Sequence, residues 1–436
     1  MPPLRDIAVT IIVVGSLPYC FLRPWVGVLV WSWLGYMNPH KMSWGFAASM
    51  PFAQMVAIAT MAGLLVTKER YPLPKVREFY LLVLLWLIFL LSTIFAEYPT
   101  SAWQQMEKVS KILVMSFVTM ALFQDRQKIK ALLWVISLSI GYFGFKGGLW
   151  AFRTGAGDMV LGPEGTFIAG NTEIGMALNM VLRTLFVLRR EETRPWLRHF
   201  LTAVFVLSIV ATLITYSRGA FLALMVVISL LFLKSRAKVW AMVLLAIAVP
   251  VALTTLPEQW FGKMQTIETY EEDPSAMGRI GSWKLAIELS KERPILGFGF
   301  RPFTREIFQE YGMYSRRGRD AHSIFFQILA EHGYVGLSLY VGLILCSFLT
   351  LRRLIRASKT DPSLRWVSDY SEGLQASLAA FVVCGAFLSM SYFDLFYHLV
   401  AIVIILKKMV LVHHREVSKE AAYPVAKPSW AAMNPG

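Results

Sequence analysis

Three basic residues in this sequence are the best placed to take part in chemistry: Arg218, Arg279 and His322. Arg218 lies in TYSRGAFLAL, between two apolar runs with almost no loop around it. Arg279 opens the stretch GRIGSWKLAIELSKERP, which has the spacing of an amphipathic helix. A cation in the first turn of a helix opposes the helix dipole, so an anion or an acidic partner should compensate it. The alternatives are an interfacial position for Arg218 and a solvated one for Arg279.

His322 is the most informative of the histidines. The run DAHSIFFQILAEHGYVGL predicts a helix with Asp320 as its N-cap and a break or close-packing point at Gly333. His322 should share a face with Phe325, Phe326 and Leu329, and a position near the helix N-terminus favours the neutral imidazole that can act as a base. Glu331 is nine residues further on, which places it on the opposite face. The alternative is a structural histidine held by hydrogen bonds.

Four further cations are weaker candidates, and each could simply be an interfacial or solvated residue. They are Lys146 in GYFGFKGGLW, Arg153 one turn later, Arg301 and Arg319. The acidic triplet at 271–273 is expected to be solvated, and there is no P-loop, CxxC or HExxH motif. We therefore expect no metal and no cofactor, and an energy-coupled pump is disfavoured.

The elements that position these residues must be membrane helices. Of the 436 residues, 56% are apolar and 16% are charged, and the mean hydropathy is +0.53. Soluble domains have about 45–50% apolar and about 25% charged residues. The composition therefore predicts an all-α polytopic membrane protein, a single transmembrane domain over 1–436. The net charge of +15 is explained by basic cytoplasmic loops, without nucleic acid as a partner. The three cysteines lie in apolar runs, so no disulfide framework is expected.

Twelve apolar runs are candidate transmembrane helices, because a span needs about 20 residues. They are 7–38, 50–66, 78–95, 109–123, 130–150, 173–189, 198–215, 219–234, 238–255, 323–350, 373–391 and 396–412. We count 7–38 as one span. A hairpin there, broken around Pro18 and Arg23-Pro24, would give thirteen spans and move the N-terminus across the membrane.

Every second connection is basic, which predicts that these connections face the cytoplasm. The alternate connections, 39–49, 96–108, 151–172, 216–218 and 256–322, then face the opposite side. The last is too long for a simple loop. Its amphipathic helix, formed by Ile280, Trp283 and Ile287 and ending before Pro294, predicts an ordered, partly helical cap. The tail, 413–436, is expected to be cytoplasmic and disordered.

Three motifs together resemble the O-antigen ligase family, within the superfamily of O-antigen ligases, O-antigen polymerases and O-oligosaccharyltransferases. The first is SRG at 217–219. The second is R-x3-W followed by P-x2-G-x-G, seen as Arg279, Trp283, Pro294, Gly297 and Gly299. The third is HS-x7-E-x-G, seen as His322, Ser323, Glu331 and Gly333. The resemblance covers about residues 130–400, and the N-terminal third is similar to the subgroup of O-glycosylation ligases.

The resemblance implies a GT-C-like, metal-independent membrane glycosyltransferase in the bacterial inner membrane, with its active site facing the periplasm. It would transfer a glycan from undecaprenyl diphosphate to lipid A–core. Arg218 and Arg279 would bind the diphosphate, with Lys146, Arg153, Arg301 and Arg319 as further ligands. His322 would act as the base, and transfer would invert the sugar. The alternatives are a polymerase or a protein O-oligosaccharyltransferase, which differ in acceptor, and a non-enzymatic transporter of lipid-linked glycans.

Overall fold

The computed structural model describes residues 4–233, 238–239, 242, 246, 260–262, 274–312, 318–359 and 361–422. All regular elements within these residues are helical. Six helices, α1, α4, α6, α8, α14 and α16, are long and apolar enough to cross a membrane, and α3 and α9 are shorter apolar helices. The chain is therefore an all-helical protein with several membrane-spanning candidates. The predicted span 238–255 lies almost entirely outside the described residues.

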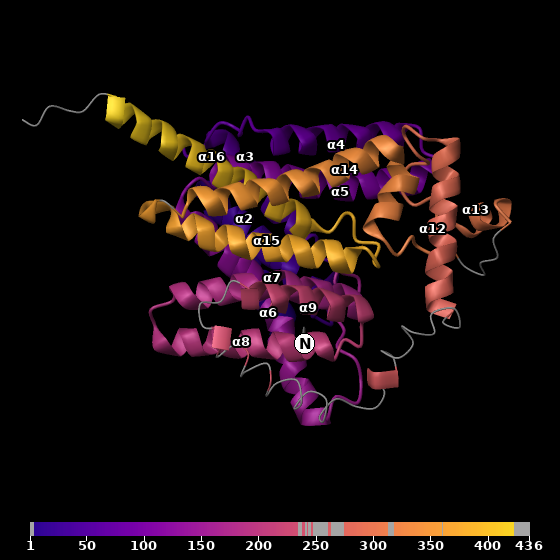
Figure 1. Cartoon of the computed structure of the whole chain (residues 1–436), viewed down its shortest axis with the longest axis horizontal. Helices are drawn as coiled ribbons and strands as arrows, with labels where there is room; N and C mark the ends of the chain where they lie inside the picture. The colour runs from indigo at the N-terminus through magenta and orange to yellow at the C-terminus, as the bar shows by residue number, and fades with distance from the viewer. Residues whose placement is uncertain are drawn as a thin grey trace, which may run out of the picture.

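The long helices run side by side along the long axis of the molecule, and α12 stands across one end (Figure 1). Their bounds are α1 Leu4–Leu22, α2 Pro24–Tyr36, α3 Phe52–Val66, α4 Arg77–Ile94, α5 Pro99–Leu122, α6 Arg126–Thr154, α7 Asn171–Glu191, α8 Pro195–Leu213, α9 Arg218–Leu233, α12 Pro274–Glu292, α13 Arg305–Glu310, α14 Ile324–Ala357, α15 Arg365–Gly385 and α16 Asp394–Ala422, with short 3-10 turns at Phe46–Ser49 and Pro362–Leu364.

The first apolar run folds as a hairpin of α1 and α2, the alternative that the sequence left open, and within this run only α1 is long enough to be a candidate span. The side chain of Asp6, at the start of α1, accepts a hydrogen bond from the Ala47 amide beyond the end of α2 (2.8 Å). The other end of α1 meets the end of α3, where Gly63 faces the Phe21 carbonyl. The chain reverses at Arg23, where Pro24 cannot continue the hydrogen bonding of α1. With 13 residues, α2 is about 20 Å long, shorter than a hydrocarbon core of about 30 Å.

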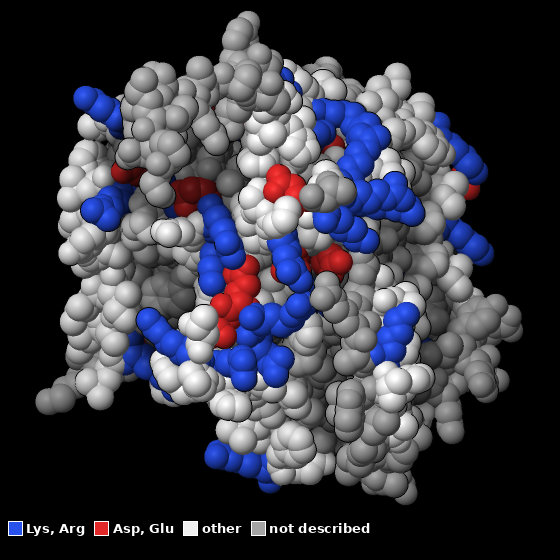
Figure 2. Space-filling model, turned by 60° about the vertical axis from the view of Figure 1, so that its left-hand side comes forward, with Lys and Arg blue, Asp and Glu red and all other residues white. Residues whose placement is uncertain are grey.

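The basic connections meet at one end of the molecule, as the sequence predicts. Glu191 at the end of α7 pairs with Arg126 and Lys130 at the start of α6, both at 3.2 Å. Lys407 of α16 pairs with Glu78 at the start of α4 (2.6 Å). Figure 2, which turns this end toward the viewer, shows Lys and Arg side chains gathered around a smaller acidic group. Apart from the turn at Arg23, which lies beside the end of α3, the remaining described connections lie at the opposite end with α12 and α13.

Two predicted loops are partly helical. Residues 99–108, predicted as part of the loop 96–108, form the first turns of α5. Gln104, Gln105 and Lys108 interrupt the apolar pattern there, which is why hydropathy misses these turns. At the other end of the chain, α16 continues to Ala422. The predicted disorder of 413–422 is therefore wrong, and His413 anchors this extension to Asp361 (2.8 Å). Residues 423–436 lie outside the described residues.

The cap on the end opposite the basic connections is ordered over its described part. It has its own apolar cluster, formed by residues of α12, α13 and the adjoining turns: Leu285, Ala286, Leu289, Phe298, Phe303, Ile307, Phe308, Ala321 and Ala330. The predicted helix before Pro294 is confirmed as α12, but its buried face is different from the predicted one. Ser282, Leu285 and Ala286 are fully buried, whereas Ile287 is 37% exposed. Small side chains allow this face to approach α14 closely.

Candidate active site

His322 occupies an unusual backbone position directly before α14. Its φ of +47° lies in the left-handed region, which is uncommon for residues other than glycine and costs about 1–3 kcal/mol. The His322 amide donates to Oγ of Ser389, in the connection after α15 (2.7 Å). The helix starts at Ile324 with Ser323 as its N-cap, so the prediction of Asp320 as the cap is wrong. His322 therefore precedes the helix and does not share the predicted face with Phe325.

α12 packs against this start of α14 through an aromatic pair. Trp283 Nε1 donates to the Ala321 carbonyl (2.9 Å), and its ring stacks on Phe326 with a centroid distance of 5.2 Å. Arg279 lies one helical turn before Trp283, on the same side of α12, and is half-buried. Because α12 begins at Pro274, Arg279 is in its second turn. The prediction that Arg279 lies in the first turn is therefore wrong. Arg319 lies against Gly278, the neighbour of Arg279.

The cations around His322 shape its electrostatics. Burial lowers the pKa of His322 below its ordinary value, and the nearby guanidinium of Arg279 lowers it further. Asp320 opposes this effect by raising the pKa, while Arg319 adds a smaller lowering. The imidazole is therefore neutral near pH 7 and able to accept a proton. The structure thus brings Arg279, Arg319 and His322 into one group.

Arg218 borders the same region from the side of α9. It is half-buried and is the first residue of α9, where Ser217 Oγ accepts from the Ala220 amide (3.2 Å). A side chain at Gly219 would contact Cys384 and Phe387 at the end of α15.

His322 reaches that end of α15 as well. The His322 amide binds Ser389, which follows α15, and two residues further on the side chain of Ile324 packs on Gly385 of α15. Arg218 and His322, which are 104 residues apart in the sequence, therefore flank the same end of α15.

A glycine-rich turn holds the remaining motif residues. Gly333 breaks the helical geometry of α14 with a φ of +66°, as predicted. A side chain there would come within 2.5 Å of the Pro294 carbonyl, and Gly297 is equally close to the α14 backbone at Glu331. The glycines of the P-x2-G-x-G motif thus let the turn lie directly on the break in α14.

Glu331 has a structural role, because it connects this turn to the helix bundle. It is 2% exposed and accepts a hydrogen bond from the Arg301 amide (3.1 Å) and another from the hydroxyl of Tyr392. Tyr392 also hydrogen-bonds His332 (2.7 Å), which contacts Ser92 of α4. This network fixes the turn against α4, α14 and the connection after α15, while Glu331 remains apart from His322.

The four weaker candidates lie in three different places. Lys146 and Arg153 are exposed on α6, and no hydrogen bond or ion pair between described residues joins them to His322. Arg301 has a left-handed backbone, with a φ of +60°, and its guanidinium donates to Gln105 of α5 (2.8 Å). Arg301 thus lies on the α5 side of the cap, whereas Arg319 lies beside Arg279.

Sequence reasoning missed Ser389, Gln105 and Lys108. Ser389 gives no local signal, because a serine in a connection is ordinary. Lys108 and Gln105 do give one, since polar residues next to an apolar run are unusual in a membrane helix. Assigning 99–108 to a loop concealed that signal.

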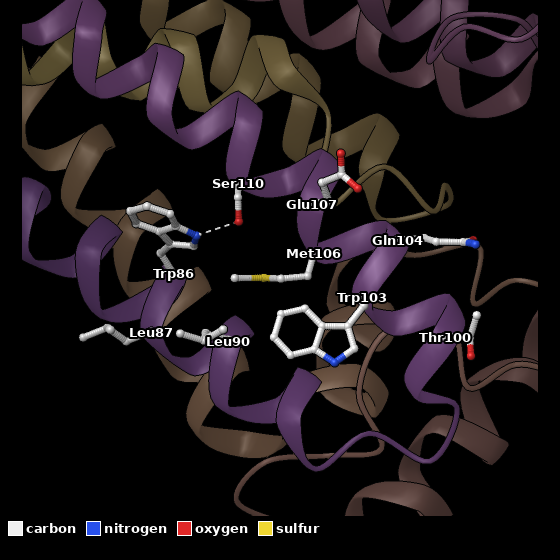
Figure 3. A pocket seen from close by; sticks show the side chains of 9 residues that line it. All are labelled: Trp86, Leu87, Leu90, Thr100, Trp103, Gln104, Met106, Glu107 and Ser110. Atoms are coloured by element: carbon white, nitrogen blue, oxygen red, sulfur yellow. Dashed lines mark hydrogen bonds between the residues drawn. The ribbon is translucent and has the colours of Figure 1, made fainter. Parts of the chain in front are cut away.

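An apolar groove of about 720 Å³ lies between α4 and α5 (Figure 3). Its lining includes Trp86, Leu90, Trp103 and Met106, and Trp86 donates to Ser110 (3.0 Å). Its acidic residue, Glu107, pairs with Lys111. Because most of its lining is apolar, the groove suits a hydrocarbon chain.

No cluster of three or more potential metal ligands occurs within the described part of the chain. The acidic triplet at 271–273 and residues 313–317 lie outside it.

Two family models match the chain. Residues 203–341 match the family described as O-antigen ligase, and this segment contains Arg218, Arg279 and His322. Residues 4–179 match a family described as of unknown function. No curated protein matches the chain. The match over 203–341, together with the apolar helices, indicates a multi-pass membrane enzyme of ligase or polymerase type.

Proposed function

We propose that the protein is an O-antigen ligase that transfers a glycan from undecaprenyl diphosphate to lipid A–core, as the match of residues 203–341 to the O-antigen ligase family supports. The observation that carries the proposal is the position of His322. Its backbone is held in a left-handed conformation by Ser389, and its side chain lies beside Arg279 and Arg319. A neutral imidazole next to fixed cations is what this reaction requires.

The proposed reaction is a single displacement at the anomeric carbon. The acceptor hydroxyl oxygen forms a bond to that carbon as its bond to the diphosphate oxygen breaks, which inverts the configuration. His322 takes the hydroxyl proton, and undecaprenyl diphosphate leaves with the bonding electron pair. Arg218 and Arg279 neutralise the charge that develops on the leaving group, with Arg319 beside them. A guanidinium suits this role because it binds two phosphate oxygens at once.

The acceptor is tested by a transfer assay with purified protein. The protein is given an undecaprenyl-diphosphate-linked glycan and, separately, lipid A–core, a polypeptide or a second lipid-linked glycan. We expect glycan on lipid A–core, and His322→Ala should abolish it. Transfer to the polypeptide alone would instead identify a protein O-oligosaccharyltransferase, and extension of the lipid-linked glycan would identify a polymerase. Absence of transfer to all three would refute a glycosyltransferase.

The site is proposed to face the periplasm from the inner membrane. Thr154 at the end of α6 and Ser418 near the end of α16 are both exposed, and they lie at opposite ends of the bundle. In a variant without the three native cysteines, cysteine at position 154 should react with an impermeant thiol reagent in intact cells. Cysteine at position 418 should react only after lysis. The reverse pattern would place the site in the cytoplasm.

A further inference from the structure

Two cations outside the His322 group converge on one another without a carboxylate partner. Arg301 and Lys108 belong to different elements, the turn after α12 and helix α5. Among the described residues, no carboxylate oxygen forms an ion pair with the charged side-chain nitrogens of either residue, for which the limit is 4.0 Å. By contrast, Lys111, one turn further along α5, pairs with Glu107. The direct contacts of both charges are thus with neutral groups, while the Asp394 carboxylate attracts Lys108 from beyond ion-pair distance.

Neutral contacts fix both side chains. Arg301 Nη2 donates to Oε1 of Gln105, which is three residues from Lys108 and therefore its neighbour on the helix surface. Nζ of Lys108 lies 3.7 Å from the centre of the Phe167 ring, in the connection between α6 and α7. The two cations are close enough to repel each other electrostatically. Both side chains are nevertheless exposed, so a ligand can reach them.

The backbone of Arg301 adds a second, independent observation. Its φ of +60° is unfavourable for an arginine, and the Glu331 carboxylate holds its amide in that position. Strain of this kind persists where the surrounding structure enforces it, which is common at ligand-binding sites. The turn therefore directs this cation toward α5 at a cost in stability.

We propose that Lys108 and Arg301 form a second anion-binding subsite, which takes a phosphate group of a substrate of the transfer reaction. Two cations without ion-pair partners suit a doubly charged oxyanion, and Gln105 can donate through its amide nitrogen. The segment from Ser389 to Asp394 connects the subsite to His322. At one end Ser389 binds the His322 amide, and at the other end Asp394 interacts electrostatically with Lys108. Those five steps span at most about 18 Å. A substrate bound at His322 can therefore extend to it.

This inference rests on the proposed function for its choice of substrates. The phosphate could belong to the donor diphosphate or to a phosphorylated sugar of the acceptor, and binding measurements separate the two. Undecaprenyl diphosphate serves as the donor probe. Lipid A–core, before and after removal of its core phosphates by a phosphatase, serves as the acceptor probe. Lys108→Met should weaken binding of one probe about ten- to a hundredfold, as expected for losing a charge-assisted contact.

Three variants make the measurement specific. Lys108→Arg should retain most of the affinity, Arg301→Gln should weaken the same probe, and Lys111→Met should bind both probes like the wild type. If the acceptor is the source, the phosphatase-treated acceptor should bind wild type and Lys108→Met equally. Unchanged affinity of Lys108→Met for both probes would overturn the subsite.

The rival role for Lys108 is to balance the charge of the buried Asp394. In that case Lys108→Met should lower the unfolding temperature, and adding Asp394→Asn should restore both stability and binding. If Lys108 binds phosphate, the double variant should remain as weak in binding as Lys108→Met. Restored binding would therefore refute the subsite. These binding measurements need no glycan transfer, so their failure is distinguishable from failure of the proposed function, which only the transfer assay reports.

Discussion

His322 is the residue whose replacement tests the proposed chemistry most directly. If it is the general base, His322→Ala should lower the single-turnover rate of transfer about 10²–10⁴-fold. At 1.36 kcal/mol for each factor of ten, this corresponds to about 2.7–5.4 kcal/mol of transition-state stabilisation. His322→Gln should fail as well, because an amide cannot accept the proton. Binding of undecaprenyl diphosphate should be nearly unchanged in both variants, and the exposed His414, replaced by Gln, is the matched control.

The neighbours of His322 fix the direction of the pH dependence. Only the neutral imidazole accepts a proton, so the rate should fall as the pH drops through the pKa of His322. Burial and Arg279 lower that pKa, so the fall should come below the ordinary value of about 6.5. Arg279→Ala removes one lowering influence and should move the fall to higher pH. Asp320→Asn removes a raising influence and should move it to lower pH.

The assay is single-turnover transfer at saturating donor, measured from pH 5 to 8, so that weaker donor binding in Arg279→Ala does not hide the shift. Opposite shifts from the two neighbours are the expected signature of His322. Partial rescue by Gln, weaker donor binding and a rate that rises in mild acid would refute the base. That combination would make His322 a hydrogen-bond donor to the diphosphate.

Two further predictions concern the arginines and the break in α14. Arg218→Ala and Arg279→Ala should each cost about 1.5–3 kcal/mol of donor binding or transition-state stabilisation. Lysine at either position should rescue only partly, because it lacks the planar fork of a guanidinium. Normal kcat/KM in both Ala variants would exclude the diphosphate role. Gly333→Ala should destabilise the protein by at least about 1–3 kcal/mol, because its φ is positive and the added carbon would come within 2.5 Å of a carbonyl. Gly342→Ala, in the same helix with open space around it, should not lower the unfolding temperature.

The sequence alone determined the membrane character of the chain and the alternation of its connections. Both depend on local information, namely runs of apolar residues and the lysines and arginines between them. It also singled out Arg218, since a cation between two apolar runs is expensive wherever the fold places it. Arg279 and His322 were singled out because each lies near the predicted start of a helix, where the dipole disfavours positive charge. The helix before Pro294 and the break at Gly333 were likewise readable from nearby residues.

Only the tertiary structure decided how distant segments meet. Ser389 holds the His322 amide from 67 residues away, and Gln105 reaches Arg301 across 196 residues. No periodicity along the chain encodes such pairs. The buried face of α12 was also mispredicted, because small residues pack against α14 where the pattern favours Ile287. Lys108 shows the same limit: hydropathy sees a polar residue that ends an apolar run, whereas the fold shows a cation on a continuous helix, beside Phe167 and within electrostatic range of Arg301.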